Sequence, residues 1–128
     1  MNKITTAGRI LFALPFAVFG INHFVMMDYY MGMLTSFIPL GAYTIIITGI
    51  LLIAASISII TRKYVKLATM ALAILLFLFI VTIHIPHLLS DSSDKTLVMI
   101  AMLKDISLMG GSILISGVCG ETEKNKAL

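Results

Sequence analysis

The chain has 128 residues, of which 59% are hydrophobic and only 12% charged. Soluble domains carry about 25% charged residues, and a domain this small has too much surface to hide so many apolar side chains. The composition therefore excludes an ordinary soluble protein and predicts a single all-α domain over residues 1–128, with the lipid bilayer as its partner. The net charge of +3 is spread over helix ends rather than concentrated in one block, which argues against a nucleic-acid partner.

Four segments are each long and apolar enough to cross a membrane, for which a helix needs about 20 residues. In chain order they cover residues 10–27, 37–60, 67–89 and 97–120. The connections between them are short, and short connections favour antiparallel neighbours. The pattern predicts an integral membrane four-helix bundle with up-down-up-down topology.

The distribution of Lys and Arg predicts the direction of these spans. Cytoplasmic loops of membrane proteins are enriched in Lys and Arg, most clearly where the loops are short. If the N-terminus is cytoplasmic, the cytoplasmic side holds Lys3, Arg9, Arg62, Lys63, Lys66, Lys124 and Lys126. The opposite side then holds only Lys95 and Lys104. We therefore expect both termini in the cytoplasm and, for a bacterial protein, a location in the inner membrane.

Two further features bear on helix packing. Ser112, Ser116 and Gly120 are spaced four apart, and small residues in such a row let helix backbones approach closely in lipid. Pro86 lies inside the third span and has no N–H, so the carbonyl of Thr82 is expected to lack its usual donor. We interpret both features first as structural rather than as parts of a functional site.

Polar residues from three spans are expected at a similar depth in the outer half of the membrane. At 1.5 Å per residue they lie within roughly 11 Å of the outer ends of their helices. Ionisable groups in a span are costly and usually face the bundle interior or a wet cavity. The candidate ligand-binding residues are Asn22, His23, His84, His87, Lys104 and Asp105.

The chemistry of this layer leaves several ligands open. Histidine and carboxylate side chains could hydrogen-bond a quinone head group and pass protons. A transition metal or a haem is the alternative, but the spacing of His84 and His87 is no specific metal signature, so we assign no metal ligand. For His87 a place in the headgroup region is the simpler reading, and Asn22 could equally serve helix packing.

The same residues resemble a known family. The matching motifs are Phe19-Gly20-Ile21-Asn22-His23-Phe24, Asp28-Tyr29-Tyr30, Thr48-Gly49, His84-Ile85-Pro86-His87-Leu88 and Leu103-Lys104-Asp105. In order and spacing they resemble the DoxX and DoxX-like family of small four-helix membrane proteins, over residues 7–117. The resemblance implies a role near redox or oxidative-stress complexes, since the family name comes from a subunit of a thiosulfate:quinone oxidoreductase. Relatives often carry a Glu after the Gly of the second span, where this chain has Leu51 and Leu52.

These observations favour a redox-associated membrane subunit with a quinone or small-molecule pocket in the outer half of the membrane. The alternative is a non-enzymatic anchor or assembly partner, in a redox complex or as a homo-oligomer. A proton or small-solute transporter is a third reading. Whether the chain catalyses a reaction is left open at this stage.

Overall fold

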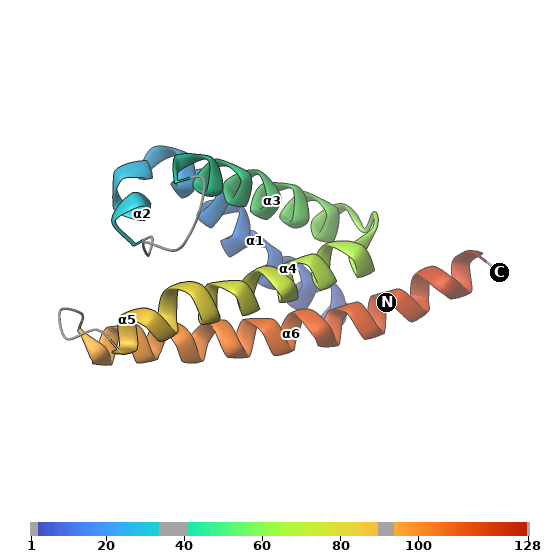
Figure 1. Cartoon of the computed structure of the whole chain (residues 1–128). Coiled ribbons are helices and arrows are strands. Elements are labelled where there is room, and N and C mark those ends of the chain that lie inside the picture. The colour runs from blue at the N-terminus through green and yellow to red at the C-terminus, as the bar shows by residue number, and fades with distance from the viewer. Residues whose placement is uncertain (1–2, 34–40, 90–93, 128) are drawn as a thin grey trace.

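The computed structural model describes residues 3–33, 41–89 and 94–127 (Figure 1). The described residues form helices and turns, with no strand among them, which confirms the all-α prediction for this part of the chain. The elements are α1 (Lys3–Val25), α2 (Met27–Met33), α3 (Ala42–Thr61), α4 (Val65–Phe79), the π-helix η1 (Ile80–His84), α5 (Ile85–Leu89) and α6 (Lys95–Ala127).

Four helical segments of the described chain are long and apolar enough to cross a membrane. They are Lys3–Val25, Ala42–Thr61, Val65–Leu89 and Lys95–Cys119. Each overlaps one of the four expected spans, although α1 begins well before residue 10 and residues 37–40 lie outside the described part. The short helix α2 occupies a stretch that was expected to be only a connection.

Local chemistry explains where two of these helices begin. The side chain of Asp94 caps α6, because its Oδ1 accepts hydrogen bonds from the N–H groups of Thr96 (3.0 Å) and Leu97 (3.3 Å). The turn from α3 to α4 is tight, and Arg62 (φ 65°) and Tyr64 (φ 57°) both take the left-handed conformation. This turn reverses the chain and directs α4 back along α3.

The helices form two antiparallel pairs, α1 with α3 and α4 with α6 (Figure 1). The pairs meet beside the α3–α4 turn, which we call the closed end. They diverge towards the end that holds α2 and α5, which we call the open end. Chain direction alternates from α1 to α3 to α4 to α6, and the start of α1 and the end of α6 both lie at the closed end.

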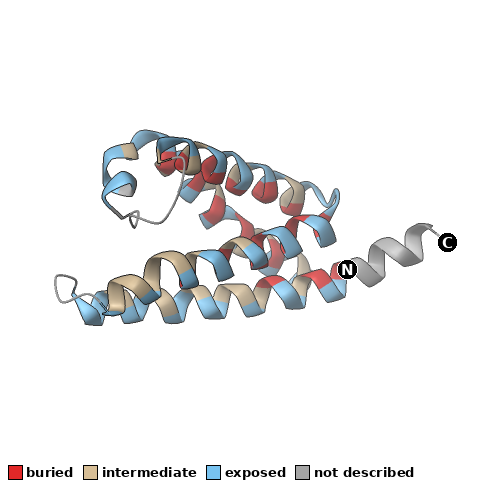
Figure 2. Ribbon diagram, viewed as in Figure 1, coloured by how far each residue is buried: buried red, intermediate tan, exposed pale blue. Residues whose placement is uncertain are grey.

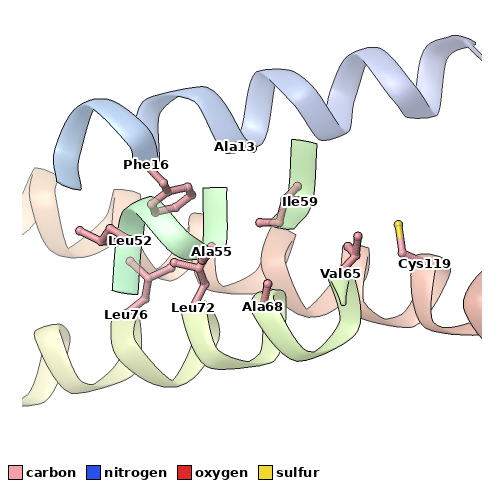
Figure 3. Packing of buried hydrophobic residues seen from close by; sticks show 10 residues of the cluster. All are labelled: Ala13, Phe16, Leu52, Ala55, Ile59, Val65, Ala68, Leu72, Leu76 and Cys119. Carbon is pink, nitrogen blue, oxygen red and sulfur yellow. The ribbon is translucent and has the colours of Figure 1, made fainter. Parts of the chain in front are cut away.

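The two helix pairs thus form a wedge, and the burial of residues follows this shape (Figure 2). In α1 and α3 the buried residues recur along the whole helix. Over residues 95–119 of α6, where burial is described, the buried residues are Ser112, Ser116 and Cys119, all from position 112 onward. The third span has no buried residue after Ile80. Figure 3 shows the resulting core. It consists of Ala13, Phe16, Leu52, Ala55, Ile59, Val65, Ala68, Leu72, Leu76 and Cys119.

Polar side chains also join the helices in this core. Ser56 Oγ donates to the carbonyl of Ala13 (2.9 Å), and Ser112 Oγ donates to the carbonyl of Thr69 (2.6 Å). Such hydrogen bonds help to hold helices together in lipid, where apolar side chains gain little by leaving the lipid for one another. Ser112 and Ser116 are both buried, as expected for members of a packing row, while the burial of Gly120 lies outside the described part.

The helices α1 and α3 approach each other closely at two glycines. A Cβ on Gly20 would lie 2.5 Å from Ile53 Cγ1 and 2.8 Å from the carbonyl oxygen of Gly49. A Cβ on Gly49 would lie 2.9 Å from the Phe24 ring and 3.0 Å from His23 Cβ. Neither position has room for a larger residue, and the contact fixes the half of the molecule that carries His23.

The third span changes its helical form just before Pro86. Residues Ile80–His84 form a π-helix, and the N–H of Ile85 donates to the carbonyl of Ile80, five residues earlier. Pro86 cannot donate to the Thr82 carbonyl, and in an α-helix its ring would clash with that carbonyl. A wider turn relieves the clash, so the span passes the proline without ending.

Candidate functional site

A pocket of about 550 Å³ lies between the two helix pairs on the side of the open end. This volume falls in the range of roughly 300–1,000 Å³ that is usual for small-molecule sites. All four membrane-length segments and α2 contribute to its walls. Its polar lining residues are His23, Tyr29, Thr44, Thr48, Thr82, His84, Lys104 and Asp105.

The lining changes from apolar to polar along the pocket. Phe16, Leu52 and Leu76 belong to the core and form its inner part. From Phe16 to His23, and from Leu76 to His84, the wall advances roughly 10 Å towards the open end at 1.5 Å per residue. A molecule in this pocket would therefore have its polar group towards the open end and its apolar part towards the core.

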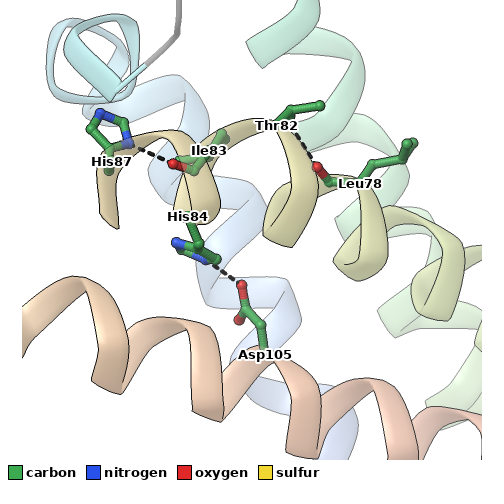
Figure 4. Close-up of polar contacts among 6 residues, drawn as sticks. All are labelled: Leu78, Thr82, Ile83, His84, His87 and Asp105. Atoms are coloured by element: carbon green, nitrogen blue, oxygen red, sulfur yellow. Dashed lines mark hydrogen bonds and ion pairs between the residues drawn. The ribbon is translucent and has the colours of Figure 1, made fainter. Parts of the chain in front are cut away.

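A contact between two side chains of the pocket joins His84 of η1 to Asp105 of α6 (Figure 4). Nε2 of His84 lies 2.6 Å from Oδ2 of Asp105, and the side chains are 12% and 19% exposed. The N–H of the imidazole donates to the carboxylate, which leaves Nδ1 as an acceptor in the neutral ring. The two residues come from different helices, so the pair also links the third and fourth spans.

His23 contributes from the opposite helix pair. Its side chain is buried, and its Nδ1–H donates to the carbonyl of Phe19, 2.6 Å away. This bond fixes the tautomer, so that in the neutral ring Nε2 is the acceptor. The close contact of Gly20 with Gly49 holds this turn of α1 against α3.

The other three candidates are placed differently. Lys104 lines the pocket and is exposed. Neither His87 nor Asn22 is among the lining residues. His87 Nδ1–H donates to the carbonyl of Ile83 (2.7 Å) within its own helical segment (Figure 4). The backbone carbonyl of Asn22 accepts a hydrogen bond from the N–H of Met26 (2.8 Å).

Sequence reasoning missed the hydroxyl groups of the pocket. Thr48 Oγ1 donates to the Thr44 carbonyl (2.7 Å) and Thr82 Oγ1 to the Leu78 carbonyl (2.6 Å). Threonine often bonds the carbonyl four residues earlier in a helix, so its presence in a span signals no site. The spacing of Thr44 and Thr48, four apart on one face, was the available signal. Tyr29 was named only within the Asp28-Tyr29-Tyr30 motif and not as a candidate ligand-binding residue, yet it lines the pocket.

The donor set does not favour a metal. Within the described part of the chain, no three His, Cys, Asp or Glu side chains are grouped closely enough to hold a metal ion. The histidines are instead engaged with a carboxylate or with backbone carbonyls. The arrangement suits recognition of a polar organic group by hydrogen bonds in a largely apolar pocket.

Comparison of the chain with protein-family models, with curated proteins and with solved structures finds no match. The resemblance to the DoxX family therefore stays a prediction that rests on the motifs themselves.

Proposed function

We propose that this protein is a membrane subunit that binds a quinone or a similar amphiphile in the pocket between its helix pairs. The observation that carries the proposal is the gradient of the pocket lining, from the core residues to His23 and the His84–Asp105 pair. A quinone has the matching shape, with a polar ring head and an apolar tail. The head would lie among the histidines, and the tail would extend towards Phe16 and Leu76.

The polar groups suit both redox forms of such a head. Quinone carbonyls accept hydrogen bonds, and the Lys104 ammonium group is a donor on the pocket wall. Quinol hydroxyls donate, and the neutral His84 ring has an acceptor nitrogen. The Asp105 carboxylate accepts a hydrogen bond from the His84 imidazole, which fixes the orientation of this ring in the pocket wall.

We further propose that the chain is a DoxX-like subunit of a redox complex in the inner membrane, with cytoplasmic termini. The motif resemblance supports the family, and the bias of Lys and Arg supports the direction. In this direction the open end faces away from the cytoplasm. The pocket then lies in the outer half of the membrane, and a partner protein supplies or removes the electrons.

The first test measures whether the purified protein contains bound quinone. Protein purified in mild detergent is examined by absorption spectroscopy, and its extracted lipids by mass spectrometry. We expect quinone at about one molecule per chain in the wild type. His84→Ala and His23→Ala should each lose it, because each removes a polar group from the pocket wall.

His87→Ala is the matched control, since it also removes an imidazole from the third span but not from the pocket. It should retain the wild-type amount of quinone. A quinone-free wild type, or equal quinone content in all three folded variants, would contradict the proposal. The histidines would then serve helix packing, and the protein would be better explained as an anchor or assembly partner.

A further inference from the structure

The π-helix lies at the point where the third span enters the pocket wall. Thr82, Ile83 and His84 all line the pocket, and all three belong to η1. The distortion therefore coincides with the polar part of the wall. π-bulges are rare in proteins as a whole, but those that occur are frequently found at functional sites. Such a bulge redirects the side chains that follow it.

The extra residue of the π turn decides which way His84 faces. In an uninterrupted α-helix, His84 would lie about 80° around the axis from Leu76, eight residues earlier, at about 100° per residue. The π turn accommodates about one extra residue, which moves the following side chains back by about 100°. This places His84 within about 20° of Leu76, the buried core residue that lines the same pocket.

We propose that Pro86 is a positioning residue for the pocket: it maintains the π turn that rotates His84 towards Asp105. Pro86 itself is not among the lining residues, so it acts through His84. Replacing it restores an N–H that can bond the Thr82 carbonyl and removes the ring that excludes an α-helical turn. The importance of this position for ligand binding rests on the function proposed above, but the geometry of the pair can be tested without any ligand.

The test uses the three histidines of the chain as reporters. Protein labelled with ¹⁵N in its histidine rings is studied by NMR in detergent, with His84→Ala to assign the signals. Asp105→Ala gives the position of the His84 Nε2 signal without its carboxylate partner. In Pro86→Ala we expect the His84 signal to move to that position, while the His23 signal, set by Phe19, stays unchanged.

A second variant restores the geometry by a different route. Deletion of Val81, an exposed residue of η1, in the Pro86→Ala background shortens the segment from Leu76 to His84 to seven residues. In a regular α-helix, seven residues again place His84 within about 20° of Leu76. The His84 signal should return to its wild-type position, and quinone content should follow it.

Three results would overturn the proposal. One is a folded Pro86→Ala protein whose His84 signal is unchanged. Another is a double variant whose His84 signal remains where Asp105→Ala places it. The third is a double variant that does not fold, since a regular helix one residue shorter must be able to replace the π turn. An absence of quinone in the wild type contradicts the proposed function and leaves this inference standing.

Discussion

Arg9 and Arg62 lie at the same end of the molecule in opposite environments. Arg9 was expected only among the cytoplasmic Lys and Arg residues that indicate topology, yet it is 4% exposed, and its Nη1 donates to the carbonyls of Ile59 and Ile60. These carbonyls are at the end of α3, where the last turn of a helix has unpaired acceptors and a partial negative charge. Arg9 thus caps α3 from α1 and joins the two helices of one pair.

We expect Arg9→Met to lower the free energy of unfolding by roughly 2 kcal/mol, the usual loss for hydrogen bonds made by a charged group. Arg62→Met is the control, because it removes the same charge from an exposed side chain at the same end. Unfolding in mixed detergent and dodecyl sulfate micelles measures both. Equal losses in the two variants would mean that the charge matters rather than the cap.

At the scale of the helices, the contact between α1 and α3 depends on residues without side chains. The Cβ of an alanine at Gly20 would meet the Gly49 carbonyl, a backbone atom that cannot turn aside as a side chain can. Gly110 of α6 offers a contrast, because a Cβ there would meet nothing within 4 Å. The same substitution should therefore have opposite consequences in the two helices.

We predict that Gly20→Ala destabilises the protein by about 1–3 kcal/mol, the usual cost of overpacking. It should also reduce quinone binding, since α1 must move away from α3 and carries His23 with it. Gly110→Ala should be neutral or slightly stabilising, because alanine favours the helix. Thermal unfolding and quinone content of the two variants test this, and a Gly20→Ala protein as stable as the wild type would contradict it.

For the whole molecule, the direction in the membrane decides which half holds the pocket. Lys63 lies in the turn at the closed end and Lys95 at the start of α6, and both are exposed. In a Cys119→Ser background we expect an impermeant maleimide to label Lys95→Cys in intact cells. Lys63→Cys should react only after the membrane is opened, because the basic turn remains in the cytoplasm. The reverse pattern would place the pocket in the cytoplasmic half.

The wedge shape is also a property of the whole molecule. The closed end has a continuous apolar core, and the pocket adjoins it without a separate domain. A ligand in the pocket would touch both helix pairs, so its binding should stabilise the fold as a whole. The pocket is thus an extension of the core in which polar groups replace part of the apolar packing.

The sequence by itself determined the helical spans and singled out six polar residues within or beside them. They are Asn22, His23, His84, His87, Lys104 and Asp105. These follow from local properties, because the length and hydropathy of a segment decide whether it can cross a membrane, and ionisable residues within it are rare. Only the tertiary structure decided that His84 rather than His87 faces Asp105 and the pocket. Which residues meet depends on the rotation of each helix about its axis. The π turn before Pro86 and the contact between Gly20 and Gly49 set that rotation and spacing, and neither can be read from an apolar pattern.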